Sequence, residues 1–121
     1  MYDAIVTGAR CAGSPTAMLL ARKGYRVLLV DKATFPSDTM SGHYLHPAGV
    51  SCIRRLGLLE DLAALGAPAQ QTITVDHGPI ALTGTPAPAP DGSELAYAPR
   101  RYRFDPMLAD AAVAAGANLR E

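Results

Sequence analysis

The chain has 121 residues, enough for one modest domain, and 49% of them are hydrophobic, so it can bury a core. Its 11 Lys and Arg residues balance its 11 Asp and Glu residues, which gives a formal net charge of zero. This balance argues against nucleic acid or an anionic membrane surface as the main partner. No apolar run approaches the roughly 20 residues of a membrane-spanning helix, and no targeting segment is visible. We therefore expect a soluble, cytoplasmic protein.

The first 31 residues predict a strand, a glycine-rich turn, a helix and a second strand. Residues 2–6 are apolar and β-prone, residues 14–23 have a helical pattern closed by Gly24, and residues 25–30 form a second apolar run that ends on Asp31. Together they make the βαβ unit that binds dinucleotides. The fold class predicted is therefore α/β, a Rossmann-like FAD/NAD(P)-binding fold with a parallel sheet.

The turn between the first strand and the helix has the residue types that a pyrophosphate site needs. Gly8 permits a sharp turn with positive φ, and Gly13 lets the helix approach the sheet closely. The helix N-terminus offers backbone N–H groups and a partial positive charge to phosphates. The candidate cofactor-binding residues of this turn are Gly8, Arg10, Cys11, Ala12, Gly13 and Ser14.

Asp31 is the candidate partner of the ribose. It ends the second strand, where a carboxylate accepts hydrogen bonds from ribose hydroxyls and repels a 2′-phosphate. This predicts the adenosine half of FAD or NAD rather than of NADP.

Arg10 stands where the G-x-G-x-x-G pattern has its middle glycine. A side chain at this position must either turn away from the pyrophosphate or reach it as a cation. We expect a phosphate contact, with the outward orientation as the alternative.

The segment after Asp31 departs from a simple NAD-binding domain, which would return to a third strand soon after the second. Residues 32–49 look irregular, and residues 50–56 and 58–65 look helical, split by Gly57. Residues 73–76, 80–83 and 94–98 look like short strands, with a Pro/Gly loop at 84–92. We read residues 32–104 as a helical and β excursion from the Rossmann-like sheet.

A helix and a third parallel strand complete the predicted fold over residues 105–121. Asp105 is a natural N-cap and Pro106 a natural first helical residue, for a helix over 105–115 that precedes a strand at 117–120. A parallel strand needs a covering layer on both faces, and the chain supplies no repeat to provide one. The sequence thus predicts an incomplete domain, either the N-terminal part of a larger protein or a truncated product.

Four segments resemble FAD-dependent oxidoreductases of the para-hydroxybenzoate hydroxylase and geranylgeranyl reductase superfamily. They are the turn at 8–14, the strand end at 27–32, the segment Asp-Thr-Met-Ser-Gly-His at 38–43, and the Arg-x-x-Phe-Asp-x-x-Leu pattern at 101–108. The resemblance covers essentially the whole chain. It implies a contact of Arg101 with FAD, and it adds Lys32, Ser41 and Gly42 to the cofactor-binding candidates.

Two departures from this family accompany the resemblance. Asp31 stands where Glu is commoner, and the family's later Gly-Asp motif does not occur in the sequence. The first, second and fourth segments are specific for the superfamily, but they do not separate hydroxylase from reductase or halogenase.

The resemblance implies a flavoenzyme, or the FAD-binding part of one, that acts as a monooxygenase or a reductase on a small organic substrate. FAD would be the cofactor, with NAD(P)H as a candidate reductant. One alternative is a non-catalytic nucleotide-binding fragment. A weaker alternative is an NAD-dependent dehydrogenase domain, which the long excursion disfavours.

Other candidate residues carry less information, and the catalytic residues stay unknown. His43 and His46 are either proton donors near a flavin or loop histidines bonded to backbone, and we favour the second reading. His77 precedes Gly-Pro and is typical of a turn. Cys11 and Cys52 lack metal-ligand spacing, so we expect free thiols and no metal site.

Overall fold

The computed structural model describes all 121 residues, and the chain forms two units. The first unit joins Met1–Ser41 to Arg100–Glu121, and the second unit is Gly42–Pro99. The two ends of the chain therefore build one unit, and the middle of the chain forms the other.

A three-stranded parallel sheet is the centre of the first unit. Its strands are β1 (Ala4–Thr7), β2 (Val27–Val30) and β5 (Asn118–Arg120), in the order β1-β2-β5. Ala4 pairs with Val27, and Leu28 pairs with Asn118, so β2 is bonded on both edges. The predicted parallel α/β sheet is confirmed.

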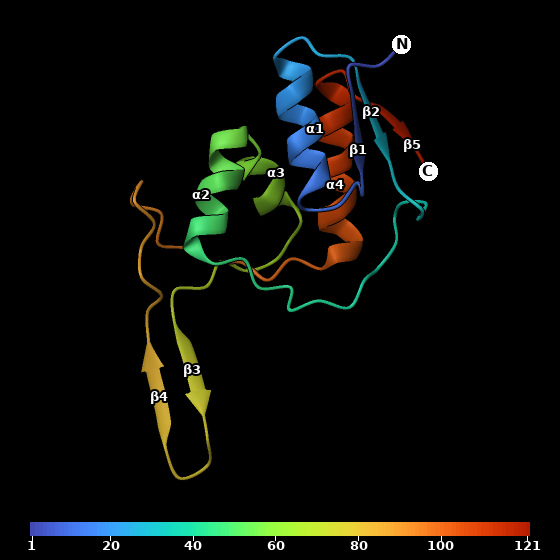
Figure 1. Cartoon of the computed structure of the whole chain (residues 1–121). Helices are drawn as coiled ribbons and strands as arrows, with labels where there is room; N and C mark the ends of the chain where they lie inside the picture. Colours follow the sequence, from blue (N-terminus) through green and yellow to red (C-terminus); the bar gives the residue numbers. More distant parts are fainter. The chain divides into compact units, whose positions relative to one another are not determined.

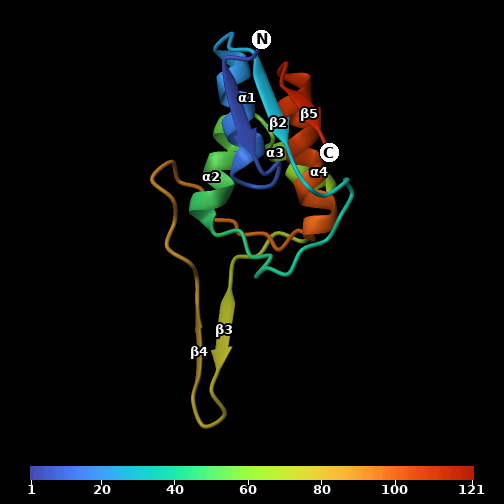
Figure 2. The ribbon, with the colours of Figure 1, turned by 45° about the vertical axis from the view of Figure 1, so that its right-hand side comes forward.

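Helices α1 (Gly13–Arg22) and α4 (Arg101–Ala114) pack against each other beside this sheet (Figures 1 and 2). Both present small buried residues, including Ala17 and Ala112, which allow their backbones to approach closely. Leu29 from β2 and Leu108 from α4 are among the largest fully buried side chains. The core of the first unit thus forms between these two helices and one face of the sheet.

The opposite face of the sheet is more exposed. Ile5 is 67% exposed, and its register partner Leu28 is only half-buried. The apolar strands are those of a sheet that is covered on both faces, but this chain covers one of them.

Helix α4 differs from its prediction at its start. It begins at Arg101 rather than at Asp105, and Arg100 is the N-cap residue, with extended backbone. Asp105 is therefore an interior residue and not the N-cap. Its carboxylate binds two arginine side chains instead of the backbone N–H groups of a helix start. Pro106 lies inside the helix, where it lacks the N–H that would bond the carbonyl of Tyr102.

The helices of the second unit are α2 (Pro47–Leu56) and α3 (Leu59–Ala64), which pack against each other. Gly57 ends α2 with a left-handed φ of 81°, as its position between the two predicted helices requires. The buried faces of these helices carry Val50, Ile53, Leu56 and Leu62. None of the protein's helices has the length and apolar character needed to cross a bilayer.

An antiparallel hairpin of β3 (Ile73–Asp76) and β4 (Ala81–Gly84) extends the second unit (Figure 1). The N–H of His77 donates to the carbonyl of Ile80 across the turn, so His77 is a turn residue as predicted. The predicted strand at 94–98 does not form. Ala96 and Tyr97 make isolated bridges to Gln70 and Leu45, and these partners come from two different segments.

Candidate nucleotide-binding site

The turn from β1 into α1 is tight, and its glycines explain how it forms. Gly8 has a φ of 95°, a region that favours glycine, and its N–H donates to the carbonyl of Val30 at 2.7 Å. A Cβ added at Gly13 would overlap the carbonyl oxygen of Gly8 and press on Val6. The backbone geometry therefore requires a glycine at both positions: Gly8 for its positive φ and Gly13 for the close approach of the chain, as the sequence predicted.

The first turn of α1 is suited to an anion. It contains no acidic side chain, and no side chain caps it through a hydrogen bond. The buried Ser14 hydroxyl instead donates to the carbonyl of Ala9 at 2.8 Å, which braces the turn from within. Backbone N–H groups at such a helix start, with the macrodipole behind them, favour a phosphate.

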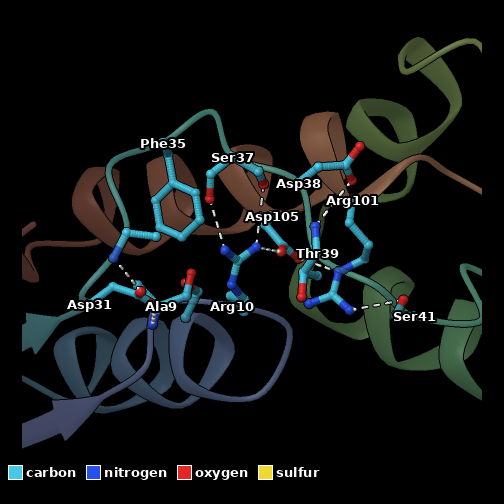
Figure 3. Close-up of polar contacts among 12 residues, drawn as sticks. Ala9, Arg10, Asp31, Phe35, Ser37, Asp38, Thr39, Ser41, Arg101 and Asp105 are labelled. Atoms are coloured by element: carbon cyan, nitrogen blue, oxygen red, sulfur yellow. Dashed lines mark hydrogen bonds and ion pairs between the residues drawn. The ribbon is translucent and has the colours of Figure 1, made fainter.

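Asp31 lies at the end of β2, beside this turn. One carboxylate oxygen accepts a hydrogen bond from the N–H of Ala9 at 2.7 Å, and the other accepts from the N–H of Ala33 at 2.9 Å (Figure 3). Burial acts to raise the pKa of Asp31. The hydrogen bonds from Ala33 and Ala9, with the charge of Arg10, outweigh burial and hold the pKa below its usual value. The carboxylate is thus ionised and fixed at the edge of the turn from β1 into α1.

Arg10 leaves the turn and binds protein groups rather than solvent. Its Nη1 atom contacts Asp105 Oδ2 at 2.5 Å and the Ser37 carbonyl at 3.3 Å. Its Nη2 atom donates to the Ser37 hydroxyl at 2.8 Å, and the guanidinium carbon lies 5.2 Å from the centre of the Phe35 ring (Figure 3). Both terminal nitrogens of Arg10 thus have protein partners in this structure. The expected contact of Arg10 with phosphate stays a prediction.

Arg101 starts α4 and shares the carboxylate of Asp105 with Arg10. Its Nε atom donates to Asp105 Oδ1 at 2.6 Å, and its Nη1 atom donates to the Ser41 hydroxyl at 3.2 Å. The hydrogen bond to Asp105 raises the pKa of Arg101 against the opposing effect of burial. Arg101 is therefore a fixed cation next to the segment that contains Ser41.

The segment at 37–41 is held to the rest of the first unit by three arginines. Ser37 binds Arg10, Ser41 binds Arg101, and Asp38 accepts from Arg100 at 2.9 Å. The Arg100–Asp38 pair is exposed, so it contributes little to stability. This segment overlaps the segment at 38–43, one of the four that carry the family resemblance.

The other sequence candidates take different positions. Cys11 and Ala12 belong to the turn and are exposed, and Lys32 is exposed directly after Asp31. Gly42 begins the second unit, so it lies outside the unit that contains Arg10, Asp31 and Arg101. In the second unit, Tyr44 and His46 stack edge to face with ring centres 4.6 Å apart, and His43 has a positive φ of 52°.

Asp105 is the residue of this site whose role the sequence reading missed. It was expected to cap a helix, whereas it is fully buried between two guanidinium groups. The spacing of Arg101 and Asp105, four residues apart in a helical pattern, is the signal for an ion pair on one helix face. The contact with Arg10, which comes from the opposite end of the sequence, has no such signal.

Known proteins resemble this chain both in sequence and in structure. The chain matches the family described as FAD binding domain over residues 1–121. It is 39% identical to squalene monooxygenase of Eremothecium gossypii over 75 residues, 62% of this chain and 15% of that protein. It is 46% identical to menaquinone reductase of Mycobacterium tuberculosis over 61 residues, 50% of this chain and 15% of that protein.

The fold agrees with the same family. The structure of the myxobacterial chondrochloren halogenase, a FAD-dependent halogenase, matches with a TM-score of 0.88 and 33% identity, over 99% of this chain and 28% of that one. The chain thus spans a small part of the length of these relatives. The resemblance to FAD-dependent oxidoreductases is confirmed: the chain belongs to the FAD binding domain family.

Proposed function

We propose that this chain binds the ADP half of FAD for a flavin-dependent oxidoreductase that acts on a small organic substrate. The observation that carries the proposal is the hydrogen bond between Asp31 and the N–H of Ala9. It sets the ribose acceptor against the phosphate-binding turn, and ribose and pyrophosphate are neighbours in the ADP half. The residues therefore fit the cofactor that the family implies.

The pyrophosphate and the adenosine ribose each have a candidate partner in the first unit. The N–H groups at the start of α1 would bind the pyrophosphate, in a tight turn that Gly8 and Gly13 make possible. Asp31 would accept hydrogen bonds from the adenosine ribose. Arg101 and Ser41 would bind the cofactor further along its length, as the family resemblance implies.

The reaction of the whole protein is proposed as oxygen insertion or reduction. Similar proteins named as a monooxygenase and as a reductase support these two classes. Bound flavin would supply the redox chemistry, and this chain would hold and orient it. NAD(P)H is the proposed reductant, and the cytoplasm is the proposed location.

Titration of the purified protein with a set of nucleotides tests this proposal. FAD should bind more tightly than FMN, which lacks the adenosine half, and NADP⁺ should bind most weakly, because Asp31 repels a 2′-phosphate. Equal affinity for FAD and FMN would show that the ADP half is not what the chain recognises. Preference for NAD⁺ over FAD would instead favour a dehydrogenase domain.

A further inference from the structure

A buried carboxylate in the first unit is shared by two arginines from opposite ends of the chain. Asp105 has no exposed surface, and its Oδ2 and Oδ1 atoms bind Arg10 at 2.5 Å and Arg101 at 2.6 Å, respectively (Figure 3). A buried ion needs such partners, because removing them leaves an uncompensated charge. The three side chains therefore form one unit, which we name the Arg10–Asp105–Arg101 cluster.

The cluster determines where the Arg10 side chain lies. The turn needs a glycine-like surface at this position, because backbone must approach the pyrophosphate. Asp105 and Ser37 bind both terminal nitrogens of Arg10, and the ring of Phe35 lies beside its guanidinium. The side chain is thus fixed to protein groups, and the turn from which it departs is fixed with it.

We propose that Asp105 is a positioning residue for the cofactor: its carboxylate holds Arg10 so that the turn at residues 8–14 keeps the shape that receives the pyrophosphate. Asp105 contacts no phosphate in this account and acts through Arg10. The same carboxylate orients Arg101, so one buried anion fixes the positions of two cationic side chains. This inference rests on the proposed function for the identity of the ligand, but not for the effect on the turn.

A different role for Asp105 would give the opposite result. If Asp105 merely neutralised the arginines, its loss would free two cations to attract the anionic cofactor, and FAD would bind more tightly. If Asp105 positions the turn, its loss weakens FAD binding although the site becomes more positive. The direction of the change therefore distinguishes the two roles.

Hydrogen exchange of the cofactor-free protein tests the positioning effect directly. Asp105→Asn removes the charge with little change in shape, and exchange at residues 8–14 should become about tenfold faster, while α2 in the second unit stays unchanged. Asp110→Asn is the matched control, because it removes an exposed carboxylate from the same helix. Unchanged exchange at 8–14 would overturn the proposal, and so would faster exchange throughout the protein.

A double-mutant cycle in FAD affinity tests the route through Arg10. Asp105→Asn should weaken FAD binding by about tenfold in the wild-type background, but by less in an Arg10→Gly background, where only its contact with Arg101 is left to lose. The same loss in both backgrounds, or tighter binding by Asp105→Asn, would overturn the proposal. If Asp105→Asn does not fold, Arg10→Ala, which leaves Asp105 its Arg101 partner, should still speed exchange at 8–14, and a failure to do so would overturn it.

The two proposals fail in distinguishable ways. If the wild-type protein binds no FAD, the proposed function is wrong, whereas the exchange measurement still decides whether Asp105 shapes the turn. If the protein binds FAD and Asp105→Asn leaves both exchange and affinity unchanged, the proposed function stands and the role of Asp105 is wrong.

Discussion

Among the individual residues, Asp31 has two roles, one in the structure of the turn and one in the proposed binding of the ligand. Its carboxylate binds the turn through Ala9, and it is the proposed acceptor for the ribose. A carboxylate has about four lone-pair positions, so its two backbone hydrogen bonds leave room for a ribose hydroxyl. Mutation at Asp31 therefore tests both the turn and the ligand.

Asp31→Ala should weaken FAD binding by about 1.5–3 kcal/mol, the range for hydrogen bonds to a charged group. Isothermal titration of the variant and the wild type measures the difference. Asp110→Ala, which removes an exposed carboxylate from α4, should leave the affinity unchanged. An Asp31→Ala variant with wild-type affinity would contradict the ribose assignment.

The lowered pKa of Asp31 predicts a dependence of stability on pH. Well above the ordinary Asp pKa of about 3.9 the carboxylate is charged in both states, and its native hydrogen bonds contribute fully. As the pH falls below that value, the unfolded chain takes up the proton first, and the contribution is lost through the lower native pKa. The unfolding free energies of wild type and Asp31→Asn should therefore converge as the pH falls from about 6 to 2. A gap that stays constant over this range would show that Asp31 has no lowered native pKa.

Gly13 has no room for even one added carbon. Gly13→Ala should destabilise the protein by about 1–3 kcal/mol or more, because the methyl group overlaps the carbonyl oxygen of Gly8. Chemical denaturation measures this loss. Gly84→Ala is the control, because nothing lies near its added carbon. A fully stable Gly13→Ala variant would mean that the turn is looser than this structure shows.

The turn at residues 8–14 could be predicted from the sequence because its backbone requirements are local. Gly8 and Gly13 are needed by the backbone within a few residues of themselves, and Asp31 follows the strand that pairs with β1. The partners of Arg10 could not be predicted, because Asp105 lies 95 residues away in the sequence. Packing that brings distant segments together leaves no local pattern.

At the scale of elements, α4 shows how tertiary contacts shift a boundary. Local preference places Asp105 at an N-cap and Pro106 at the first helical position. The structure instead extends the helix back to Arg101, which brings Arg101 and Asp105 onto one face as a pair. Asp105 therefore makes two ion pairs in place of an N-cap, which is worth about 1 kcal/mol.

Leu108 anchors α4 in the core of the first unit. Leu108→Ala should lower the unfolding free energy by about 2–5 kcal/mol, because the side chain is 2% exposed and leaves a cavity. Val113→Ala on the same helix, where the side chain is 46% exposed, should change it by less than about 0.5 kcal/mol. Thermal and denaturant unfolding compare the two variants, and equal effects would mean that α4 does not pack as described.

At the scale of the whole molecule, the α/β class, the parallel sheet and the return of residues 105–121 to it as a helix and a third strand were predicted from the sequence. A motif that is continuous in sequence, such as the βαβ unit at residues 2–31, can be recognised from neighbouring residues. The first unit also needs residues 100–121, where the sequence predicted a third parallel strand but did not indicate that this strand pairs with β2. The single-residue bridges of Ala96 and Tyr97 were likewise read as a strand, because β propensity does not reveal which partner is near.

The central claim is that the turn at residues 8–14 and Asp31 receive the ADP half of FAD. Titration of ¹⁵N-labelled protein with FAD, followed by amide chemical shifts, tests it most directly. We expect saturable shifts that centre on Gly8 to Ser14 and on the residues around Asp31, with the same pattern for ADP and a much weaker one for FMN. Saturable binding whose shifts lie elsewhere, with residues 8–14 unmoved, would contradict the account.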